Sequence, residues 1–420
     1  MRRVAVTGVG AVTPLGLDSA STWEALVTGR SGIGRLETFD VTGFPVRIAG
    51  QVRGFRLTDT VPTTIGFRHL SRAGEFGVAA AWQALADAHL EPGAYAAERC
   101  GIAMGASVGR PDLQWLLDVG HARASSGNPL ALVPYPPGDA IAYSQNIATA
   151  AMSRMFGASG PMIGISTACS GSGHAIGEAY RAIQEGDAVA MLAGGYDSLT
   201  TWTDVLGFSL LGALNADANE DPETACRPFD RHRAGFVLGE GAAVLVLEDL
   251  DAAHKRGATV LAEIVGYGST LNAWRITDSP ADGNGAIQAM EAALATSPHG
   301  SEIIDYVVAH GTGTHGNDAS ETMAIKKVFG ARAYELMISS PKSMTGHLTS
   351  AAAALNTVAA IYAMRDQVVP PTANLTTPDP KLDLDYVPLI ARRAPVGGAL
   401  VNAFAFGGTN TSLALVPPEK

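Results

Sequence analysis

The strongest pattern along the chain is a series of short apolar runs separated by longer segments with helical periodicity. Most of these runs are continuously apolar rather than alternating, which is typical of strands covered on both faces. The runs with the length of strands are residues 4–7, 100–104, 162–166, 188–193, 242–247, 259–266, 306–309, 337–340 and 399–403. Their order, with helices between them, predicts an α/β fold in which buried mixed sheets lie between helical layers.

Helical spacing of apolar residues predicts helices over residues 76–89, 172–184, 285–295, 319–329 and 350–364. The last of these is apolar almost all round and rich in small side chains, so we expect it at the centre of the molecule.

Stretches rich in Pro, Gly, Ser, Asp or Asn predict loops at 124–139 and 215–233. A charged stretch near residue 250 separates two strand-rich parts, so we expect an N-terminal half of residues 1–252 and a C-terminal half of residues 253–420.

Composition narrows the class of protein. Of 420 residues, 47% are hydrophobic and 16% are charged, which allows a large core. The net charge of −11, with no block of Lys and Arg, argues against nucleic-acid binding. No apolar run reaches the length of about 18 residues that a membrane span needs. The start of the chain lacks the pattern of a signal peptide.

The cysteines favour a cytoplasmic protein. Cys100, Cys169 and Cys226 lie far apart and form no CxxC pair, which argues against a zinc site or a disulfide framework and fits a reducing compartment. Cys100 and Cys226 are interpreted as structural.

Cys169 has a different setting. It lies in GISTACSGSG, residues 164–173, where a strand breaks into a glycine-rich turn and a small-residue helix follows. Backbone N–H groups and the helix dipole at such a position favour thiolate over thiol. A nucleophilic cysteine is therefore one hypothesis, and an inert core cysteine is the other.

Two histidines carry similar pairs of interpretations. His310 ends a buried strand in VVAHGTGTHGND, residues 307–318, and sites form at such strand ends. His347 follows SPKSMTG, residues 340–346, at the start of the apolar helix, where the positive end of the helix dipole keeps an imidazole neutral. Each could equally be a hydrogen-bonded structural histidine. His310 and His315 lack the HExxH pattern of a metal pair.

Two further patterns concern glycines. The segment NAFAFGGTN, residues 402–410, predicts a tight turn that is either a plain hairpin or a source of backbone N–H groups for an oxyanion. The segment GVGAVT, residues 8–13, resembles a dinucleotide fingerprint but has Thr13 in place of the third glycine, so nicotinamide binding is disfavoured.

Together these motifs resemble the β-ketoacyl-acyl carrier protein synthases of the thiolase-fold superfamily, most closely the elongating Cys-His-His type. The resemblance also includes RPFD at 227–230, GFVLGEG at 235–241, KSMTGH at 342–347 and FGGTN at 406–410, in the order of that family. It implies a five-layer α-β-α-β-α fold of two pseudo-equivalent halves, and an acyltransferase.

The resemblance also implies the chemistry. Cys169 would take an acyl group from a carrier-bound thioester, with the backbone N–H groups of Cys169 and Phe406 holding the oxyanion. His310 and His347 would bind the thioester carbonyl of malonyl-carrier protein during a decarboxylative Claisen condensation. The product would be a 3-ketoacyl-carrier protein extended by two carbons.

Other residues take supporting roles by the same resemblance. Lys342, for which Glu321 is the candidate carboxylate partner, would support the histidines electrostatically, and Phe406 would gate entry of acyl and malonyl groups. Contacts to substrate and its phosphopantetheine arm are expected from Thr312, Thr314, Phe208, Gly407 and Thr409. No bound cofactor or metal is expected.

Three positions depart from the family pattern. Ala405 replaces a glycine of the loop before Phe406, which suggests a stiffer loop. Ser350 and Asn356 replace a common glycine and a common glutamate, which puts in doubt any site built on that carboxylate.

The segments 317–322, 369–375 and 378–388 look more like the ketosynthase subunit of bacterial type II polyketide systems, although the stretch 369–388 also occurs, less fully, in fatty-acid synthases. The alternatives are fatty-acid elongation as a homodimer and, in another class, a non-catalytic partner subunit.

The expected partner is an acyl carrier protein, which we expect to dock on a basic patch including Arg68 and Arg72. The resemblance implies a homodimer, or a heterodimer with a chain-length-factor homologue, through an interface within about residues 108–154.

Overall fold

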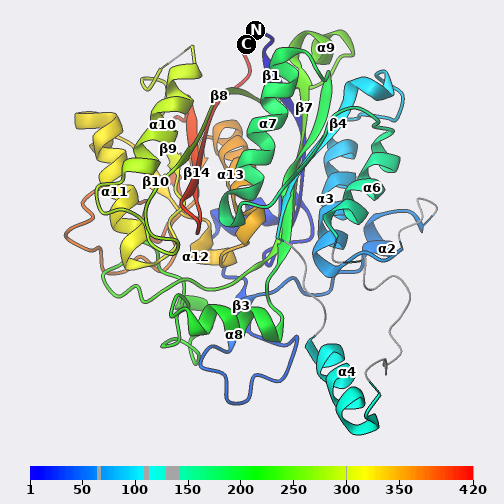
Figure 1. Ribbon diagram of the computed structural model, residues 1–420. Coiled ribbons are helices and arrows are strands. Elements are labelled where there is room, and N and C mark those ends of the chain that lie inside the picture. Colours follow the sequence, from blue (N-terminus) through cyan, green and yellow to red (C-terminus); the bar gives the residue numbers. More distant parts are fainter. Residues whose placement is uncertain (64–67, 108–112, 129–141, 143, 299, 420) are drawn as a thin grey trace.

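The computed structural model describes residues 1–63, 68–107, 113–128, 142, 144–298 and 300–419 (Figure 1). Among these residues, ten strands form one mixed sheet. In spatial order the strands are β10 (Met337–Ser339), β9 (Tyr306–Val308), β13 (Ala399–Phe404), β14 (Thr409–Val416), β8 (Ala262–Leu271), β1 (Val4–Val12), β7 (Glu240–Asp249), β6 (Ala190–Ser198), β4 (Cys100–Ala106) and β5 (Met162–Ile165). Two small two-stranded sheets pair β2 (Ile33–Arg35) with β3 (Ile48–Gly50) and β11 (Val368–Val369) with β12 (Arg392–Arg393).

The large sheet consists of two halves built in the same way. The N-terminal half has the order β5-β4-β6-β7-β1, and the C-terminal half has the equivalent order β10-β9-β13-β14-β8. In each half the first three strands are parallel and the remaining neighbours are antiparallel. The halves join where Val4, Ala5 and Val6 pair with Ile264, Glu263 and Ala262. The predicted pair of pseudo-equivalent halves is confirmed by this topology.

Helices complete five layers. The central layer contains α7 (Gly171–Glu185) and α13 (Ala352–Asp366), which contact each other and strands of both halves. The N-terminal sheet is covered on its other face by α3 (Arg72–Asp87) and α6 (Gln145–Phe156). The C-terminal sheet is covered by α10 (Asn284–Thr296) and α11 (His315–Phe329). Figure 1 shows these layers side by side, with α11 and α10 at the left and α3 and α6 at the right.

The central helices occupy equivalent places in the chain. In the chain, helix α7 lies between β5 and β6, and α13 lies between β10 and β13. Each therefore follows the edge strand of its half of the large sheet. Every residue of α13 from Ala352 to Met364 is buried, as its all-round apolar pattern predicts. The helix ends at Gln367, whose φ of +54° cannot continue a right-handed helix.

The start of the outer helix α3 has a local explanation. The hydroxyl of Ser71 accepts a hydrogen bond from the N–H of Gly74 and caps α3, so this helix begins one turn before the predicted residue 76. Seven helices in the described part of the chain were not predicted from the sequence, and four of them have nine residues or more: α1 (Ser19–Val27), α4 (Leu113–Ser126), α6 and α8 (Trp202–Leu210). The remaining short helices are α2 (Leu57–Thr60), α9 (Leu250–Lys255) and α12 (Lys342–Thr345).

Two strands of the ten-stranded sheet differ from expectation, and the short strands β2, β3, β11 and β12 were not predicted. The segment 402–410 contains the hairpin turn between β13 and β14. Strand β14 was not predicted, because its first residues are polar although its last residues are apolar. Strand β5 was expected to be covered but is an edge strand, and its Met162 is 56% exposed.

The predicted loop 215–233 is irregular apart from the short 3₁₀ turn Pro222–Thr224. Of the loop predicted over 124–139, residues 124–126 are the end of α4, and residues 129–139 lie outside the described residues. The proposed boundary at residue 252 falls inside α9 and stays a prediction. Within the described part of the chain, no helix is long and apolar enough to cross a membrane.

Candidate active site

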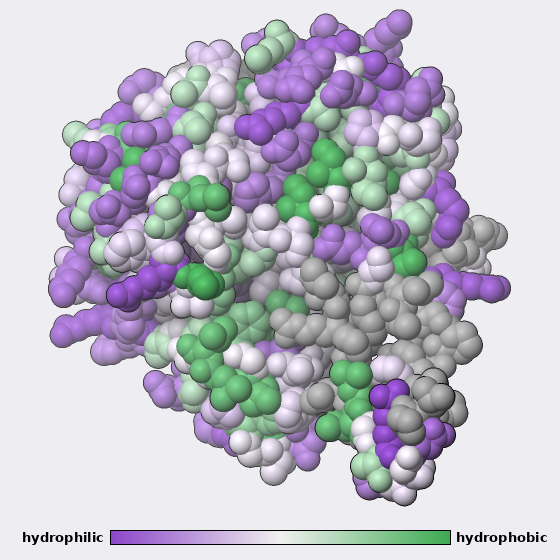
Figure 2. Space-filling model, in the orientation of Figure 1, coloured by the Kyte–Doolittle hydropathy of each residue, from purple (hydrophilic) through white to green (hydrophobic). Residues whose placement is uncertain are grey.

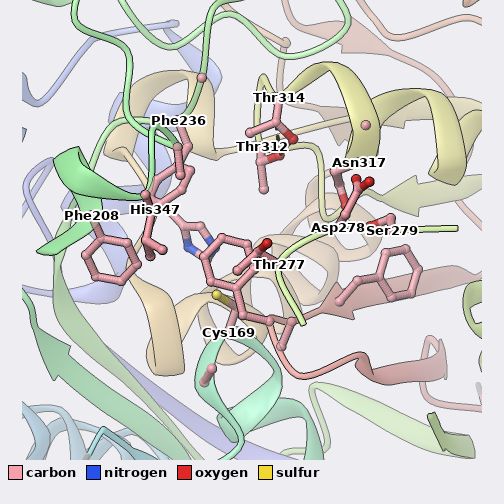
Figure 3. Close-up of a pocket in the computed structure, with 18 of the residues that line it drawn as sticks. Cys169, Phe208, Phe236, Thr277, Asp278, Ser279, Thr312, Thr314, Asn317 and His347 are labelled. Carbon is pink, nitrogen blue, oxygen red and sulfur yellow. Dashed lines mark hydrogen bonds between the residues drawn. The ribbon is translucent and has the colours of Figure 1, made fainter. Parts of the chain in front are cut away.

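A cavity of about 310 Å³ brings together the cysteine and both histidines that the sequence singled out. Cys169 lies before α7, His347 lies before α13, and His310 follows β9. The two positions before the central helices are equivalent in the two halves, so the cavity lies where these helix starts converge. In Figure 3 the sulfur of Cys169 points into the space between Phe208 and His347 on one side and Thr277 on the other.

The turn that carries Cys169 is tightly constructed. It is a 3₁₀ turn, Ala168–Ser170, in which Ala168 has a φ of +47°. A non-glycine residue in this region stores backbone strain and is common at functional sites. The hydroxyl of Ser170 lies 2.8 Å from the hydroxyl of Thr409, which ties the cysteine turn to the segment that follows Phe406.

The surroundings of the Cys169 thiol favour its protonated form, contrary to the expectation from the helix dipole, although the residue as a whole is half-buried. Burial raises the pKa of this thiol to about 11, although the charge of Lys342 acts in the opposite direction. The backbone N–H groups of Cys169 and Phe406 both reach the sulfur and also lower the pKa, but burial dominates. The prediction of a favoured resting thiolate is therefore wrong, because the sequence indicates the helix start but not the depth of the thiol.

The same two N–H groups form a pair of donors beside the sulfur. An oxygen that develops negative charge on a carbon bonded to Sγ would lie within their reach. Donors held in this way stabilise the charge that forms in acyl transfer, and removal of one typically lowers the rate by about 10²–10³-fold.

His347 has one ring nitrogen engaged and one free. The N–H of Thr349 donates to Nδ1 of His347 at 3.0 Å, so Nδ1 carries no proton. Burial and the charge of Lys342 hold the pKa of His347 well below its usual range, so the ring is neutral and its proton is on Nε2. Nε2 is buried and has no partner among the described residues. His347 is therefore a neutral donor aimed into the cavity.

His310 is neutral for similar reasons. Burial, the charge of Lys342 and the neighbouring His347 hold the pKa of His310 well below its usual range. Nζ of Lys342 lies 3.5 Å from Nδ1 of His310, which leaves Nε2 as the nitrogen that bears the proton. The two histidine rings lie 5.3 Å apart, centroid to centroid, so they could address one carbonyl oxygen together.

Lys342 and Glu321 hold the backbone of His310 from two sides. Nζ of Lys342 donates to the carbonyl oxygen of His310 at 2.5 Å. The carboxylate of Glu321 accepts from the N–H groups of His310 and Gly311, each at 2.8 Å. Glu321 raises the pKa of Lys342 through its charge, but burial is the larger effect and lowers that pKa to about 8. Glu321 is thus an electrostatic neighbour of Lys342, and its oxygens accept hydrogen bonds from the backbone of His310 and Gly311.

The cavity has an apolar side and a polar side. Leu199, Phe208, Leu211 and Phe236 line the apolar side near Cys169. The polar side is lined by Thr277, Asp278, Ser279, Thr312, Thr314 and Asn317 (Figure 3). The hydroxyls of Thr312 and Thr314 lie 2.9 Å apart. Such a division suits a substrate with an apolar chain at one end and an amide-bearing arm at the other.

Other predicted residues lie near the cavity but do not line it. Gly407, with a φ of +86°, donates its N–H to the carbonyl of Ile276 at 2.7 Å. Thr409 lies behind the cysteine turn, against Ser170.

The two arginines of the predicted patch differ. Arg72 forms an ion pair of 2.7 Å with the fully buried Glu240 and donates to the carbonyl of Val52, so it holds the fold together. Arg68 is exposed.

Sequence reasoning missed the loop between β8 and α10 that supplies Thr277, Asp278 and Ser279. A usable signal existed, since these polar residues lie between a strand and a helix, where α/β proteins place sites. It also missed Asp197, which lies at the end of β6 and binds the turn after His347. No group of metal-ligating side chains that could hold an ion occurs among the described residues.

Comparisons with known proteins match one family over most of the chain. The family model described as the beta-ketoacyl synthase N-terminal domain matches residues 1–253, and that of the C-terminal domain matches residues 261–376. The chain is 40% identical over 413 residues to a 3-oxoacyl-[acyl-carrier-protein] synthase 2 of Vibrio harveyi, covering 98% of each chain. It is 41% identical to the enzyme of the same name from Coxiella burnetii, covering 99% of this chain and 98% of that one.

Solved structures are similar over the whole chain. One is a type II polyketide synthase acyl-carrier protein in complex with its ketosynthase bound to the hexaketide, at a TM-score of 0.88, 32% identity, and coverage of 99% of this chain and 100% of that one. Another is the ishigamide ketosynthase/chain length factor, at a TM-score of 0.87, 31% identity and full coverage of both chains.

Proposed function

The chain belongs to the β-ketoacyl synthase family and is an acyl-transferring condensing enzyme, and on that premise we propose that it condenses an acyl group held on Cys169 with malonyl-acyl carrier protein. The product is a 3-ketoacyl-carrier protein extended by two carbons. The observation that carries this proposal is the geometry of one cavity, which is lined by a thiol and two neutral histidines and contains the buried, unpartnered Nε2 of His347.

In the first half-reaction Sγ of Cys169 attacks the thioester carbon of the acyl-carrier protein. The N–H groups of Cys169 and Phe406 hold the oxyanion. The bond from carbon to the phosphopantetheine sulfur breaks, and that sulfur leaves as a thiol with the proton lost by Cys169. Because the resting thiol has a pKa of about 11, its proton must leave as the new bond forms.

In the second half-reaction malonyl-carrier protein occupies the cavity. His310 and His347 donate from Nε2 to its thioester carbonyl while the bond to the carboxylate breaks and CO₂ departs. The electron pair of that bond forms an enolate, whose carbon attacks the acyl-Cys169 carbonyl. The bond to Sγ then breaks, and the thiolate of Cys169 takes a proton from solvent. The proposal requires no bound cofactor, since loss of CO₂ itself supplies the carbanion.

Neutral histidines can serve this step as hydrogen-bond donors. A thioester carbonyl gains negative charge as CO₂ leaves, and donors that are already in place stabilise it without reorganisation. The charge of Lys342 lies behind His310 and stabilises the same developing charge at longer range. The apolar side of the cavity fits the acyl chain, and the polar side fits the phosphopantetheine arm.

Mass spectrometry of the intact protein tests the proposal. Incubation with acyl-carrier protein is expected to add one acyl mass to the peptide containing Cys169, and C169A is expected to remain unmodified. Absence of acylation in the native protein would refute the catalytic assignment and favour the alternative of a non-catalytic partner subunit. Release of CO₂ from malonyl-carrier protein measures the second half-reaction separately.

The pathway has two candidates. Polyketide biosynthesis is supported by the segments 317–322, 369–375 and 378–388 and by the likeness to the two polyketide structures. Fatty-acid elongation is the alternative that fits the higher identity, 40% and 41%, to enzymes named 3-oxoacyl-[acyl-carrier-protein] synthase 2. The two are separated by comparing kcat/KM for saturated acyl-carrier protein with that for a 3-ketoacyl-carrier protein, which only a polyketide enzyme should extend well.

We also propose that the chain works as a dimer. Strand β5 ends the ten-stranded sheet in the described part of the chain, and its side chains are alternately exposed and half-buried. An unpaired edge of this kind is suited to pairing with a second sheet. The partner is a second copy or a chain-length-factor homologue, and native mass spectrometry with and without the homologue distinguishes these. The predicted interface of residues 108–154 lies partly outside the described residues.

The carrier protein is proposed to dock near the exposed Arg68. R68E tests this assignment, which is refuted if KM for the carrier protein is unchanged. R72E is a poor test, because Arg72 is paired with buried Glu240 and its loss would weaken the fold.

A further inference from the structure

Asp197 is a buried carboxylate at the point where the two halves of the molecule meet. It lies at the carboxyl end of β6 and is only 3% exposed. Its Oδ2 accepts three hydrogen bonds, from the hydroxyl of Ser107 at 2.7 Å, the hydroxyl of Thr349 at 2.5 Å and the N–H of Ser350 at 3.0 Å. Its Oδ1 accepts from the N–H of Ser198 at 3.0 Å.

Two of these bonds fix the turn that follows His347. Thr349 has a φ of +46°, a strained conformation for a β-branched residue. Such strain, typically of about 1–3 kcal/mol, persists only where surrounding contacts hold it. Asp197 holds both Thr349 and Ser350, and no other carboxylate hydrogen-bonds to either residue in the described structure.

The strained turn has one direct effect on the active site. It directs the N–H of Thr349 at Nδ1 of His347, at 3.0 Å. This bond is what leaves the single ring proton on Nε2, the nitrogen that faces the cavity. If the turn relaxed, Nδ1 would lose its donor and the ring could carry its proton on either nitrogen.

We propose that Asp197 is a positioning residue that fixes His347 as the Nε2–H tautomer, so that the malonyl half-reaction depends on it and acyl transfer to Cys169 does not. The inference rests on the proposed function for its catalytic consequence, but the tautomer itself does not require that function. A carboxylate suits the role because three donors converge on one oxygen, and hydrogen bonds to a charged acceptor are shorter and stronger than those to an amide.

The charge of Asp197 adds to the expected difference between the effects on decarboxylation and on acylation of Cys169. Its negative charge also contributes to raising the pKa of the Cys169 thiol. Removal of that charge would therefore make the thiol easier to ionise, so acyl transfer has no reason to slow. A defect of general folding would instead slow both half-reactions together.

The test compares three variants of the full chain. D197N removes the charge, and T349V removes one hydroxyl donor while it keeps the shape and the N–H of residue 349. E248Q is the matched control, because Glu248 is a fully buried carboxylate of the next strand, β7, bonded to Tyr95 and Arg256 and away from the cavity. Each variant is assayed for acylation of Cys169 and, separately, for decarboxylation of malonyl-carrier protein.

D197N is expected to lower decarboxylation by about 10- to 100-fold while acylation stays within about threefold of wild type, as when a catalytic imidazole loses the partner that orients it. T349V should lower the ratio of the decarboxylation rate to the acylation rate in the same direction but less. E248Q should lower the Tm without changing this ratio. Equal slowing of both half-reactions by D197N and T349V, or no slowing, would overturn the inference.

The tautomer provides a readout without substrate. In histidine-labelled protein, ¹⁵N NMR with H347N for assignment should show a protonated Nε2 and a bare Nδ1 for His347 in the native chain, and a mixture in D197N. An unchanged tautomer in D197N refutes the inference even if the native chain proves inactive. Inactivity of the native chain toward both carrier-bound substrates refutes the proposed function instead.

Discussion

Nζ of Lys342 and the carbonyl oxygen of His310 are joined by a hydrogen bond of 2.5 Å, which places a buried positive charge directly behind a catalytic candidate. Burial lowers the pKa of this lysine to about 8. The ammonium is therefore charged below about pH 8 and becomes neutral above it. Its charge depends on pH in a range where an ordinary lysine would still be fully protonated.

Decarboxylation is expected to slow as the pH rises through about 8, because Lys342 loses the charge that stabilises the developing enolate. K342M should be slower at pH 7 and should lack this descending limb. The rate of CO₂ release from malonyl-carrier protein, measured for both proteins across the range, checks the prediction. A descending limb that persists in K342M would assign the titration to another group.

The two neutral histidines should make the fold less stable in mild acid. Burial holds the pKa of His310 and His347 well below the ordinary value, so the unfolded chain binds protons there that the folded chain does not. Stability is therefore present above about pH 6.5 and falls as the pH drops below it, by up to about 1.4 kcal/mol per pH unit for each histidine.

Denaturant unfolding at a series of pH values measures this slope. H347N removes one titrating group and should reduce the slope by about one proton, whatever its effect on absolute stability. The prediction fails if H347N and the native chain show the same slope between about pH 5 and 6.5.

Glu321 is expected to affect stability and decarboxylation through its hydrogen bonds to the backbone. E321Q replaces one of the two oxygens that accept from His310 and Gly311 with an NH₂ group, which sets a donor against a donor in a buried place. The expected loss of stability is about 1–3 kcal/mol. Decarboxylation should fall more than acylation of Cys169, because the displaced strand end carries His310. Urea unfolding and the two half-reaction assays provide the measurements.

Gly105 is expected to be intolerant of any side chain. A Cβ at this position of β4 would lie 2.2 Å from the carbonyl carbon of Gly171, the first residue of α7. G105A must therefore push the start of α7, and Cys169 with it, away from the sheet. We expect a loss of about 1–3 kcal/mol in stability and a slower acylation of Cys169.

Gly120 offers the matched control. It lies within α4, and a Cβ there would have no heavy atom within 4 Å. G120A should be neutral or stabilising by up to about 1 kcal/mol, because alanine favours helix more than glycine does. Equal effects of the two substitutions on the Tm would contradict the packing argument.

The hydroxyl pair of Ser170 and Thr409 should affect the first half-reaction. T409V removes the 2.8 Å contact that joins the cysteine turn to the segment after Phe406. The two oxyanion donors would then lose their fixed spacing, so acylation is expected to slow by about 10-fold or more. Decarboxylation should change less, since the histidines do not contact this pair. Pre-steady-state acylation by mass spectrometry measures the effect.

The sequence was sufficient for the fold because continuous apolar strands and an all-round apolar helix have few alternative placements. Helix α13 is central, as its pattern predicts. The sequence was insufficient for strands whose position depends on contacts with residues far away in the chain. Strand β5 has the composition of a covered strand but lies at an edge, and β14 begins with polar residues that belong to a hairpin.

The active-site residues were also predicted only as far as local motifs allow. Motifs at strand ends and helix starts indicated Cys169, His310 and His347, and the fold brings all three to one cavity. The pKa of Cys169 was predicted in the wrong direction because it depends on burial, which no local pattern reports. Asp197 was missed because its role depends on a contact between residues 152 positions apart.

The repetition of strand order in the two halves has a consequence for how this catalyst can change. The cavity lies between two copies of one architecture, yet the N-terminal copy supplies the thiol and the C-terminal copy supplies both imidazoles. On the proposed function, the thiol of the N-terminal half holds the growing chain, and the histidines of the C-terminal half activate the unit to be added. A change in either half can therefore reach both steps, because Phe406 of the C-terminal half places a donor beside Cys169 and Asp197 of the N-terminal half holds the turn after His347.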